Sequence, residues 1–288
     1  MVKSRILLLL AGLLVISGCA SGGTDPYNRA VEHYGRGRVN ESISQYQQAI
    51  RVNPSDPLPK FNLAVIYQDQ GRKDEAEKLY RAILVQHPEF APAWSNLASL
   101  QETTGQMMAA EQSYRRAVEV DRNDSWAASQ FGYFLFRAGR LDEASSLFEE
   151  SLRRNEKCAN AWFGLGEIAE RRDDVRSALK SYDRAMFYNP SDIQAFLRSA
   201  DLRMQKGDRA GAVVLLRRAS KLDPKRGDIH LLLGRLLSEE GKWKEAERAY
   251  EQARENGAPR GECDRELSII YGRLARECGI KAEMDGAE

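Results

Sequence analysis

The side chains that could carry out chemistry in this sequence are few and widely separated. A cysteine thiolate can act as a nucleophile or metal ligand, and a histidine as a base or metal ligand. The candidates are Cys19, Cys158, Cys263, Cys278, His33, His87 and His230. No histidine has a partner at the spacing of a metal site or catalytic triad, and no CxxC or phosphate-binding glycine loop occurs. The sequence therefore predicts no enzyme, metal, cofactor or small-molecule substrate.

Cys19 is distinguished by its position after a short apolar run. Lys3 and Arg5 precede apolar residues 6–16, a run shorter than the roughly 20 residues of a membrane-spanning helix. The run ends Ile16-Ser17-Gly18-Cys19, which resembles a bacterial lipobox. The resemblance implies that residues 1–18 are a signal peptide and that Cys19 receives a diacylglycerol and an acyl chain such as palmitate. An ordinary signal peptide with a chance cysteine is the alternative.

Residues 19–24 would then form a lipidated N-terminus and a short linker. The residue after the cysteine is Ala20. In the lipoprotein family an aspartate there favours inner-membrane retention, so the resemblance implies an outer-membrane protein that faces the periplasm. Five extended residues reach only about 17 Å, which would hold the folded part close to the membrane.

The other three cysteines are expected to be unpaired thiols. Cys263 and Cys278 lie near opposite ends of one predicted helix, about 22 Å apart, which is too far for a disulfide.

The net charge argues against nucleic-acid binding. With 43 basic and 42 acidic residues, or 41 and 42 without Lys3 and Arg5, the chain has no basic excess for binding nucleic acid.

An internal repeat of 34 residues organises most of the chain. Its first positions are Gly23, Pro57, Ala91, Ser125, Ala159, Ile193 and Gly227. Small residues recur at position 8, namely Ala30, Ala64, Ala98, Gly132, Gly166, Ala200 and Gly234. Large residues recur at position 24, namely Tyr46, Tyr80, Tyr114, Phe148, Tyr182, Leu216 and Tyr250. The small residues allow two antiparallel helices to approach, and the large ones fill the space between neighbouring hairpins.

Position 15 is glycine in six repeats, where it ends a helix in a left-handed conformation, and Asp173 in the fifth. This pattern resembles the tetratricopeptide repeat family. The resemblance implies an all-α fold, a right-handed superhelical solenoid of seven helix-turn-helix hairpins over residues 25–260. Pro26 should delay the start of the first helix. Residues 261–278 read as a C-terminal capping helix, since an open array needs a cap, and residues 279–288 as a disordered tail.

The first helices of such an array line a concave groove, where a protein or peptide partner is expected to bind. Positions 2, 5, 9 and 12 should project into it because they share one helical face. The predicted groove residues are Phe61, Val65, Ser95, Ser99, Trp126, Tyr133, Phe136, Phe163, Glu167 and Leu197. Alternatively, several of these side chains pack between adjacent helices and never meet solvent. Few cations line this face, so capture of a C-terminal carboxylate is not expected.

Two lipoprotein families suggest a role for the scaffold. Residues Gln130–Gly139 are similar to the aromatic, glycine-containing helix of the type IV pilus pilotins. That resemblance implies an assembly factor whose groove holds a segment of an outer-membrane secretin. The alternatives are an envelope adaptor that recruits peptidoglycan hydrolases or synthases, for which no distinctive motif occurs, and an envelope scaffold of another kind.

Overall fold

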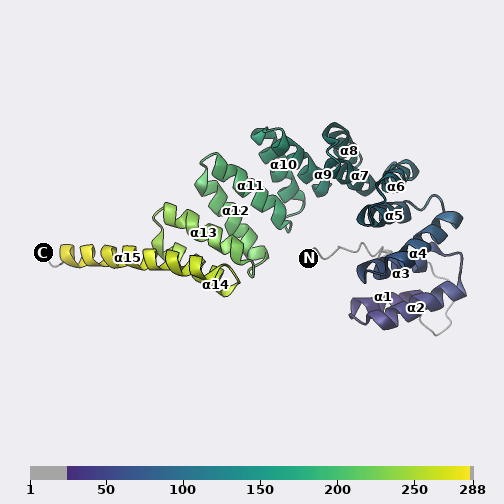
Figure 1. Cartoon of the computed structure of the whole chain (residues 1–288), viewed down its shortest axis with the longest axis horizontal. Coiled ribbons are helices and arrows are strands. Elements are labelled where there is room, and N and C mark those ends of the chain that lie inside the picture. The colour runs from purple at the N-terminus through teal and green to yellow at the C-terminus, as the bar shows by residue number, and fades with distance from the viewer. Residues whose placement is uncertain (1–24, 286–288) are drawn as a thin grey trace. The chain divides into compact units, whose positions relative to one another are not determined.

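The computed structural model describes residues 25–285, and their side chains as far as residue 276. Within this range it contains fifteen helices and no strand, which confirms the all-α prediction (Figure 1). The helices are α1 (Pro26–Gly35), α2 (Val39–Val52), α3 (Pro57–Asp69), α4 (Lys73–Gln86), α5 (Ala91–Thr103), α6 (Met107–Val120), α7 (Ser125–Arg137), α8 (Leu141–Arg154), α9 (Ala159–Arg171), α10 (Val175–Tyr188), α11 (Ile193–Gln205), α12 (Arg209–Leu222), α13 (Gly227–Glu239), α14 (Trp243–Glu255) and α15 (Arg260–Asp285).

The first fourteen helices pair into seven hairpins, and each hairpin packs against its neighbours within two compact units. Unit 1 ends at Arg154 and contains α1–α8, whereas unit 2 begins at Asn155 and contains α9–α15. The predicted effect of Pro26 is confirmed, since α1 begins at that residue and has 10 residues where the other first helices have 13. Cys19 and the predicted signal peptide lie outside the described residues.

The small and large repeat positions meet inside each hairpin. All seven side chains at position 24 are essentially inaccessible to solvent. The helix backbones are so close that a Cβ atom added to Gly132 would lie 2.8 Å from the ring of Phe148. The same construction at Gly166 meets Tyr182 at 2.5 Å. The large side chain therefore occupies space that only a small residue on the facing helix leaves open.

The turns inside the hairpins use the predicted left-handed residues. Gly37, the first of the six glycines at position 15, has a φ of 74°, and the other five have similar positive values. Asp173 takes the same role in the fifth hairpin with a φ of 57°. This confirms that an aspartate can replace glycine in the turn, because its short polar side chain tolerates this backbone region.

Aspartates begin several of the helices. The side chains of Asp56, Asp124 and Asp192 each accept a hydrogen bond from a backbone N–H of the first turn that follows. Asp174 and Asp208 do the same for the second helices α10 and α12. These carboxylates satisfy N–H groups that have no partner within the helix and interact favourably with its dipole.

Asp208 provides a pH-dependent test of this capping. Its carboxylate accepts the Gly211 N–H at 2.9 Å and the Arg203 guanidinium at 2.8 Å, and these interactions lower its pKa. Since the folded pKa lies below the unfolded one, the contribution to stability is present above the ordinary aspartate value of about 3.9 and is lost as pH falls through the folded pKa.

We therefore expect Asp208→Asn to lower the urea midpoint at neutral pH, with the difference from wild type disappearing in acid. Asparagine is itself a good capping residue, so the substitution isolates the charge. Asp201→Asn on α11, whose carboxylate caps no helix, is the control. An Asp208→Asn deficit of equal size at acid and neutral pH would contradict the assignment.

A hydrogen bond that the repeat pattern does not reveal joins several first helices to the turn just before them. The side chain at position 4 of a first helix reaches the backbone oxygen at position 32 of the preceding repeat. Trp94 and Trp162 donate through Nε1 to Pro88 O and Glu156 O, each at 2.8 Å. Lys60 reaches Pro54 O, and His230 Nε2 lies 3.0 Å from Pro224 O. These contacts give Trp94, Trp162 and His230 structural roles at the joints.

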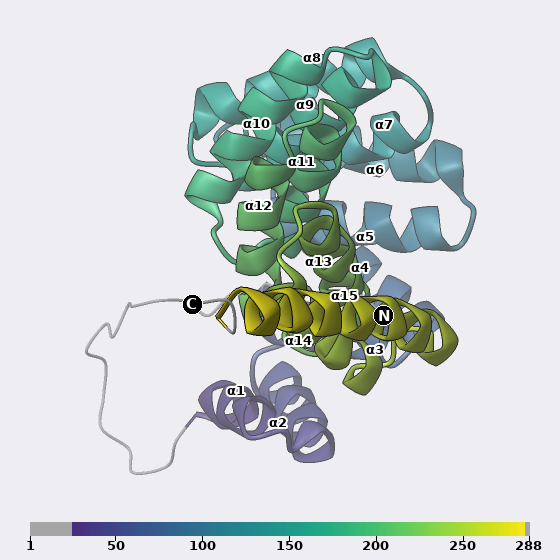
Figure 2. The same ribbon diagram turned by 90° about the vertical axis from the view of Figure 1, so that its left-hand side faces the viewer.

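The last helix covers the end of unit 2. Helix α15 packs against α14 (Figure 2). Leu267 and Ile270 are buried in the core that includes the seventh hairpin, as the prediction of a capping helix requires. The predicted end of this helix at residue 278 is wrong, because α15 continues to Asp285 and residues 279–285 are helical. Gly279 costs a helix only about 1 kcal/mol, and the residues after it are mostly good helix formers.

Cys158 and Cys263 are free thiols, half-buried and buried respectively, and burial raises the pKa of Cys263. Cys263 and Cys278 belong to one helix, as predicted. Among the described residues, no helix is both long and apolar enough to cross a membrane.

Candidate functional site

The predicted groove residues lie on first helices of both units. Unit 1 contains Phe61, Val65, Ser95, Ser99, Trp126, Tyr133 and Phe136 on α3, α5 and α7. Unit 2 contains Phe163, Glu167 and Leu197 on α9 and α11.

Four of the predicted residues do not line an open surface. Phe61, Val65, Ser95 and Phe136 are all buried. The Phe61 ring packs at 6.0 Å from Tyr80 and 5.5 Å from Phe90, measured between ring centroids. The prediction of a partner-contacting role is wrong for these side chains, because neighbouring helices cover them. Their apolar character is explained by this packing.

The remaining unit 1 residues are on a half-exposed surface over α5 and α7, which we call the α5–α7 face. It comprises Ser99, Glu102, Trp126, Tyr133 and Arg137. The guanidinium of Arg137 donates from Nε and Nη2 to the two carboxylate oxygens of Glu102, at 2.7 and 2.8 Å. This two-point geometry fixes the orientation of both side chains and ties α7 to α5.

The hydroxyl of the buried Tyr114 adds a hydrogen bond to this ion pair. Tyr114 donates to Glu102 at 3.1 Å, and burial together with the neighbouring carboxylate raises its pKa. It therefore remains a protonated donor. Partial burial disfavours the charge of Arg137, but Glu102 outweighs this effect and raises the Arg137 pKa. Tyr133 adds an aromatic ring, held edge-on at 4.9 Å from the buried ring of Phe148.

Trp126 lies at the opposite end of α7. Its side chain is 38% exposed, and its backbone N–H is capped by Asp124. About 16 Å of helix separates it from Arg137. An aromatic side chain and an ion pair therefore lie at the two ends of α7, with Tyr133 between them.

Unit 2 repeats part of this arrangement. Glu170 accepts a hydrogen bond from Tyr182 at 2.7 Å and an ion pair from Arg198 on α11 at 3.4 Å. Phe163 is half-buried against Tyr182, with ring centroids 5.3 Å apart. Leu197 packs partly into the core, and Glu167 is half-buried. All three predicted unit 2 residues, Phe163, Glu167 and Leu197, are therefore only partly exposed to solvent.

The charged residues of these surfaces that the sequence does not predict are Glu102, Arg137 and Arg198. A signal for them exists, since an acidic residue at position 12 precedes the buried tyrosine at position 24 by 12 residues in both units. Position 12 is therefore placed to accept the tyrosine hydroxyl and a cation from the next hairpin. Over the described residues, no cluster of histidine, cysteine and acidic side chains could hold a metal ion.

The fold and this surface define a class of protein, a helical-hairpin repeat array with a half-exposed polar and aromatic face. The tetratricopeptide repeat family matches residues 27–89, 61–125 and 131–193, and a second description of the same repeat matches residues 203–262. The chain belongs to the tetratricopeptide repeat family. Proteins of this family are generally non-enzymatic scaffolds that bind proteins or peptides.

Individual relatives share the repeat rather than the whole architecture. Superkiller protein 3 of Schizosaccharomyces pombe is 31% identical over 108 residues, which cover 35% of this chain and 8% of that protein. The chain thus spans under a tenth of the length of the first curated relatives it matches.

Solved structures agree in fold over longer spans. A tetratricopeptide repeat protein from Parabacteroides merdae has a TM-score of 0.57 at 19% identity, over 85% of this chain and 97% of that one. Pseudomonas aeruginosa PilF has a TM-score of 0.61 at 18% identity, over 75% of this chain and 97% of that one. At these identities the likeness establishes the fold alone.

Proposed function

We propose that this chain is a lipid-anchored scaffold of the bacterial envelope, facing the periplasm from the outer membrane, which holds a segment of an outer-membrane secretin during type IV pilus assembly. The observation that carries the proposal is the α5–α7 face. It combines a fixed ion pair with aromatic side chains, the residue types that dominate binding energy at protein interfaces.

Two features of the sequence connect this face with the envelope. The pilotin-like stretch Gln130–Gly139 forms most of α7 and the turn after it, so it includes both Tyr133 and Arg137 of the face. The lipobox-like Ile16–Cys19 supports an anchor only a few residues before α1. A scaffold so close to the bilayer is well placed to meet a partner that inserts there.

Affinity capture from envelopes of piliated cells tests the proposal. The tagged, lipidated protein is expected to enrich a secretin, and Trp126→Ala/Arg137→Ala should reduce that enrichment about tenfold, equivalent to 1.4 kcal/mol. Both side chains are well exposed, so their loss should not unfold unit 1. Met108→Ala/Arg116→Ala on α6, a pair of exposed apolar and basic side chains, is the control and should capture as wild type does.

The same preparation tests the anchor. Cys19→Ser should move the protein from the membrane fraction to the soluble periplasmic fraction. Equal capture of the secretin by a folded Trp126→Ala/Arg137→Ala protein would rule out the face as the binding site. Enrichment of peptidoglycan hydrolases in place of a secretin would refute the pilus assignment.

A further inference from the structure

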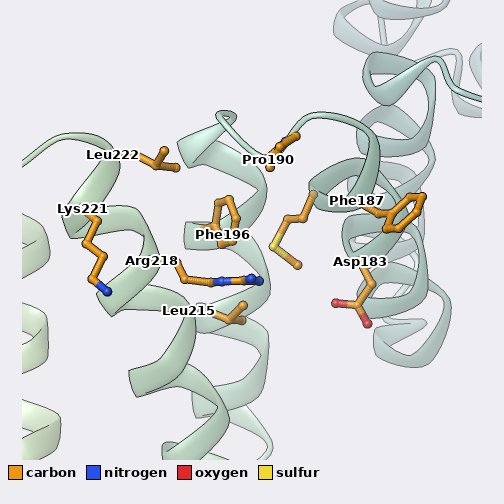
Figure 3. Close-up of a pocket in the computed structure, with 9 residues that line it drawn as sticks. Asp183, Phe187, Pro190, Phe196, Leu215, Arg218, Lys221 and Leu222 are labelled. Carbon is orange, nitrogen blue, oxygen red and sulfur yellow. The ribbon is translucent and has the colours of Figure 1, made fainter.

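Unit 2 contains a pocket that shares no residue with the α5–α7 face of unit 1, and the proposed function does not use it. Side chains of α10, α11 and α12, with Pro190 in the loop between the first two, enclose a volume of about 520 Å³ (Figure 3). Met186, Phe196 and Leu215 line it with buried apolar surface. The volume far exceeds the roughly 30 Å³ of one water molecule and lies within the range of ligand sites.

The pocket occurs at a joint that lacks the usual hydrogen bond. Position 4 is a donor in four other hairpins, but here it is Phe196, which has no side-chain donor for the turn at Pro190. Its ring lies on the pocket wall instead, and the guanidinium carbon of Arg218 is 5.9 Å from the ring centroid. Figure 3 shows the Arg218 side chain extending from α12 toward Phe196.

The charge around the pocket is predominantly positive. Helix α12 contains four basic residues and no acidic one. Two of the four form ion pairs, Arg209 with Glu239 and Arg217 with Glu245. The other two, Arg218 and Lys221, line the pocket, and neither forms an ion pair with a carboxylate in the part of the chain described.

One acidic residue, Asp183, also lines the pocket and faces these cations from α10. It is 4.0 Å from Arg203, and burial raises its pKa. Among the described residues, its ion pair is with Arg203 and not with Arg218 or Lys221.

The rim of the pocket carries large apolar side chains in contact with solvent. Phe187 is 73% exposed and Leu222 is 40% exposed. The Phe187 ring packs against Tyr188 at 5.1 Å. Exposed aromatic surface beside unpaired cations, over an apolar floor, is typical of a protein interaction site.

We infer that this pocket binds an acidic peptide segment of a partner protein, which inserts one large apolar side chain between Phe187 and Phe196. Acidic residues beside that side chain form ion pairs with Arg218 and Lys221. An arginine can bind a carboxylate through two donors, and the desolvated floor strengthens the interaction. The hollow shape fits a projecting side chain better than a flat bilayer.

Fluorescence anisotropy with a defined peptide tests the inference. The probe is a fluorescein-labelled peptide with a central Phe-Leu pair flanked by three glutamates on each side. The protein is the full chain with Cys19→Ser, so that acyl groups do not interfere. We expect saturable binding that weakens with salt, as screening predicts. Arg218→Glu/Lys221→Glu and, separately, Phe187→Ser should each raise the Kd about tenfold or more.

Controls separate charge, apolar anchor and position. A peptide with glutamine for glutamate and one with serine for Phe-Leu should both bind weakly. Lys244→Glu/Arg248→Glu makes the same charge change on exposed residues of α14 and should leave the Kd unchanged. An equal loss in that variant would overturn the inference, as would absence of peptide binding by a protein that instead binds phosphatidylglycerol vesicles. Circular dichroism establishes that each variant is folded.

Discussion

Phe148→Ala should lower the free energy of unfolding of unit 1 by roughly 3 to 5 kcal/mol, the usual cost of removing a fully buried phenylalanine. The ring of Phe148 is inaccessible to solvent, packs edge-on against Tyr133, and fills the space opposite Gly132. Because glycine has no side chain with which to fill the vacated space, the cavity should collapse poorly. Urea unfolding followed by circular dichroism should show a clearly lower midpoint.

Phe187→Ala is the matched control for this experiment. It removes the same side chain from an exposed site on α10, where a change within about 0.5 kcal/mol is expected. Similar midpoints for Phe148→Ala and wild type would show that position 24 does not hold the hairpin together.

A side chain that is too large at position 8 should also be destabilising. Gly166→Val tests this at the equivalent contact of the fifth hairpin. A Cβ atom at residue 166 would lie 2.5 Å from the Tyr182 ring, which is itself buried and held by Glu170. Alanine occurs opposite tyrosine in other hairpins, for example Ala64 with Tyr80, so one methyl group can be accommodated with slightly different spacing. The branched valine adds two more carbons, and a loss of about 1 to 3 kcal/mol is expected.

Gly272→Val provides the comparison. Residue 272 is also helical, but nothing lies within 4 Å of the position of an added Cβ atom. The substitution there should be neutral or slightly stabilising, since valine has a better helix propensity than glycine. If Gly166→Val were as stable as Gly272→Val in urea unfolding, the close approach of α9 and α10 would not limit side-chain size.

The sequence predicts the hairpins well because their determinants are local and recur in every repeat. Alternation of a small residue at position 8 with a large one at position 24 specifies which helices pair, and the left-handed residue at position 15 specifies where the chain turns. Asp173 shows that the turn depends on backbone geometry rather than on glycine itself. The end of α15 was harder to predict, because one glycine followed by good helix formers does not stop a helix.

The candidate site was predicted less well, for a physical reason. Helical periodicity places Phe61 and Tyr133 on the same face of their helices, but it does not report how closely the next hairpin covers that face. Phe61 is covered and Tyr133 only partly so. The ion pair between Glu102 and Arg137 spans 35 residues and depends on the offset between hairpins, which a single repeat does not reveal. The pocket near Phe196 likewise lies beside a turn that receives no hydrogen bond from position 4, which the repeat pattern alone does not reveal.

The helices contact mainly their neighbours along the chain, and this has a consequence for how the protein acquires its structure. A 34-residue hairpin contains both members of its own packing pair, so little chain must be searched before the first stabilising contacts form. Low sequence separation between contacting residues goes with fast folding, and a repeat array can grow outward from any folded part. As synthesis proceeds from the N-terminus, the chain can therefore gain one hairpin after another, leaving only a short unfolded segment exposed to proteases at any moment.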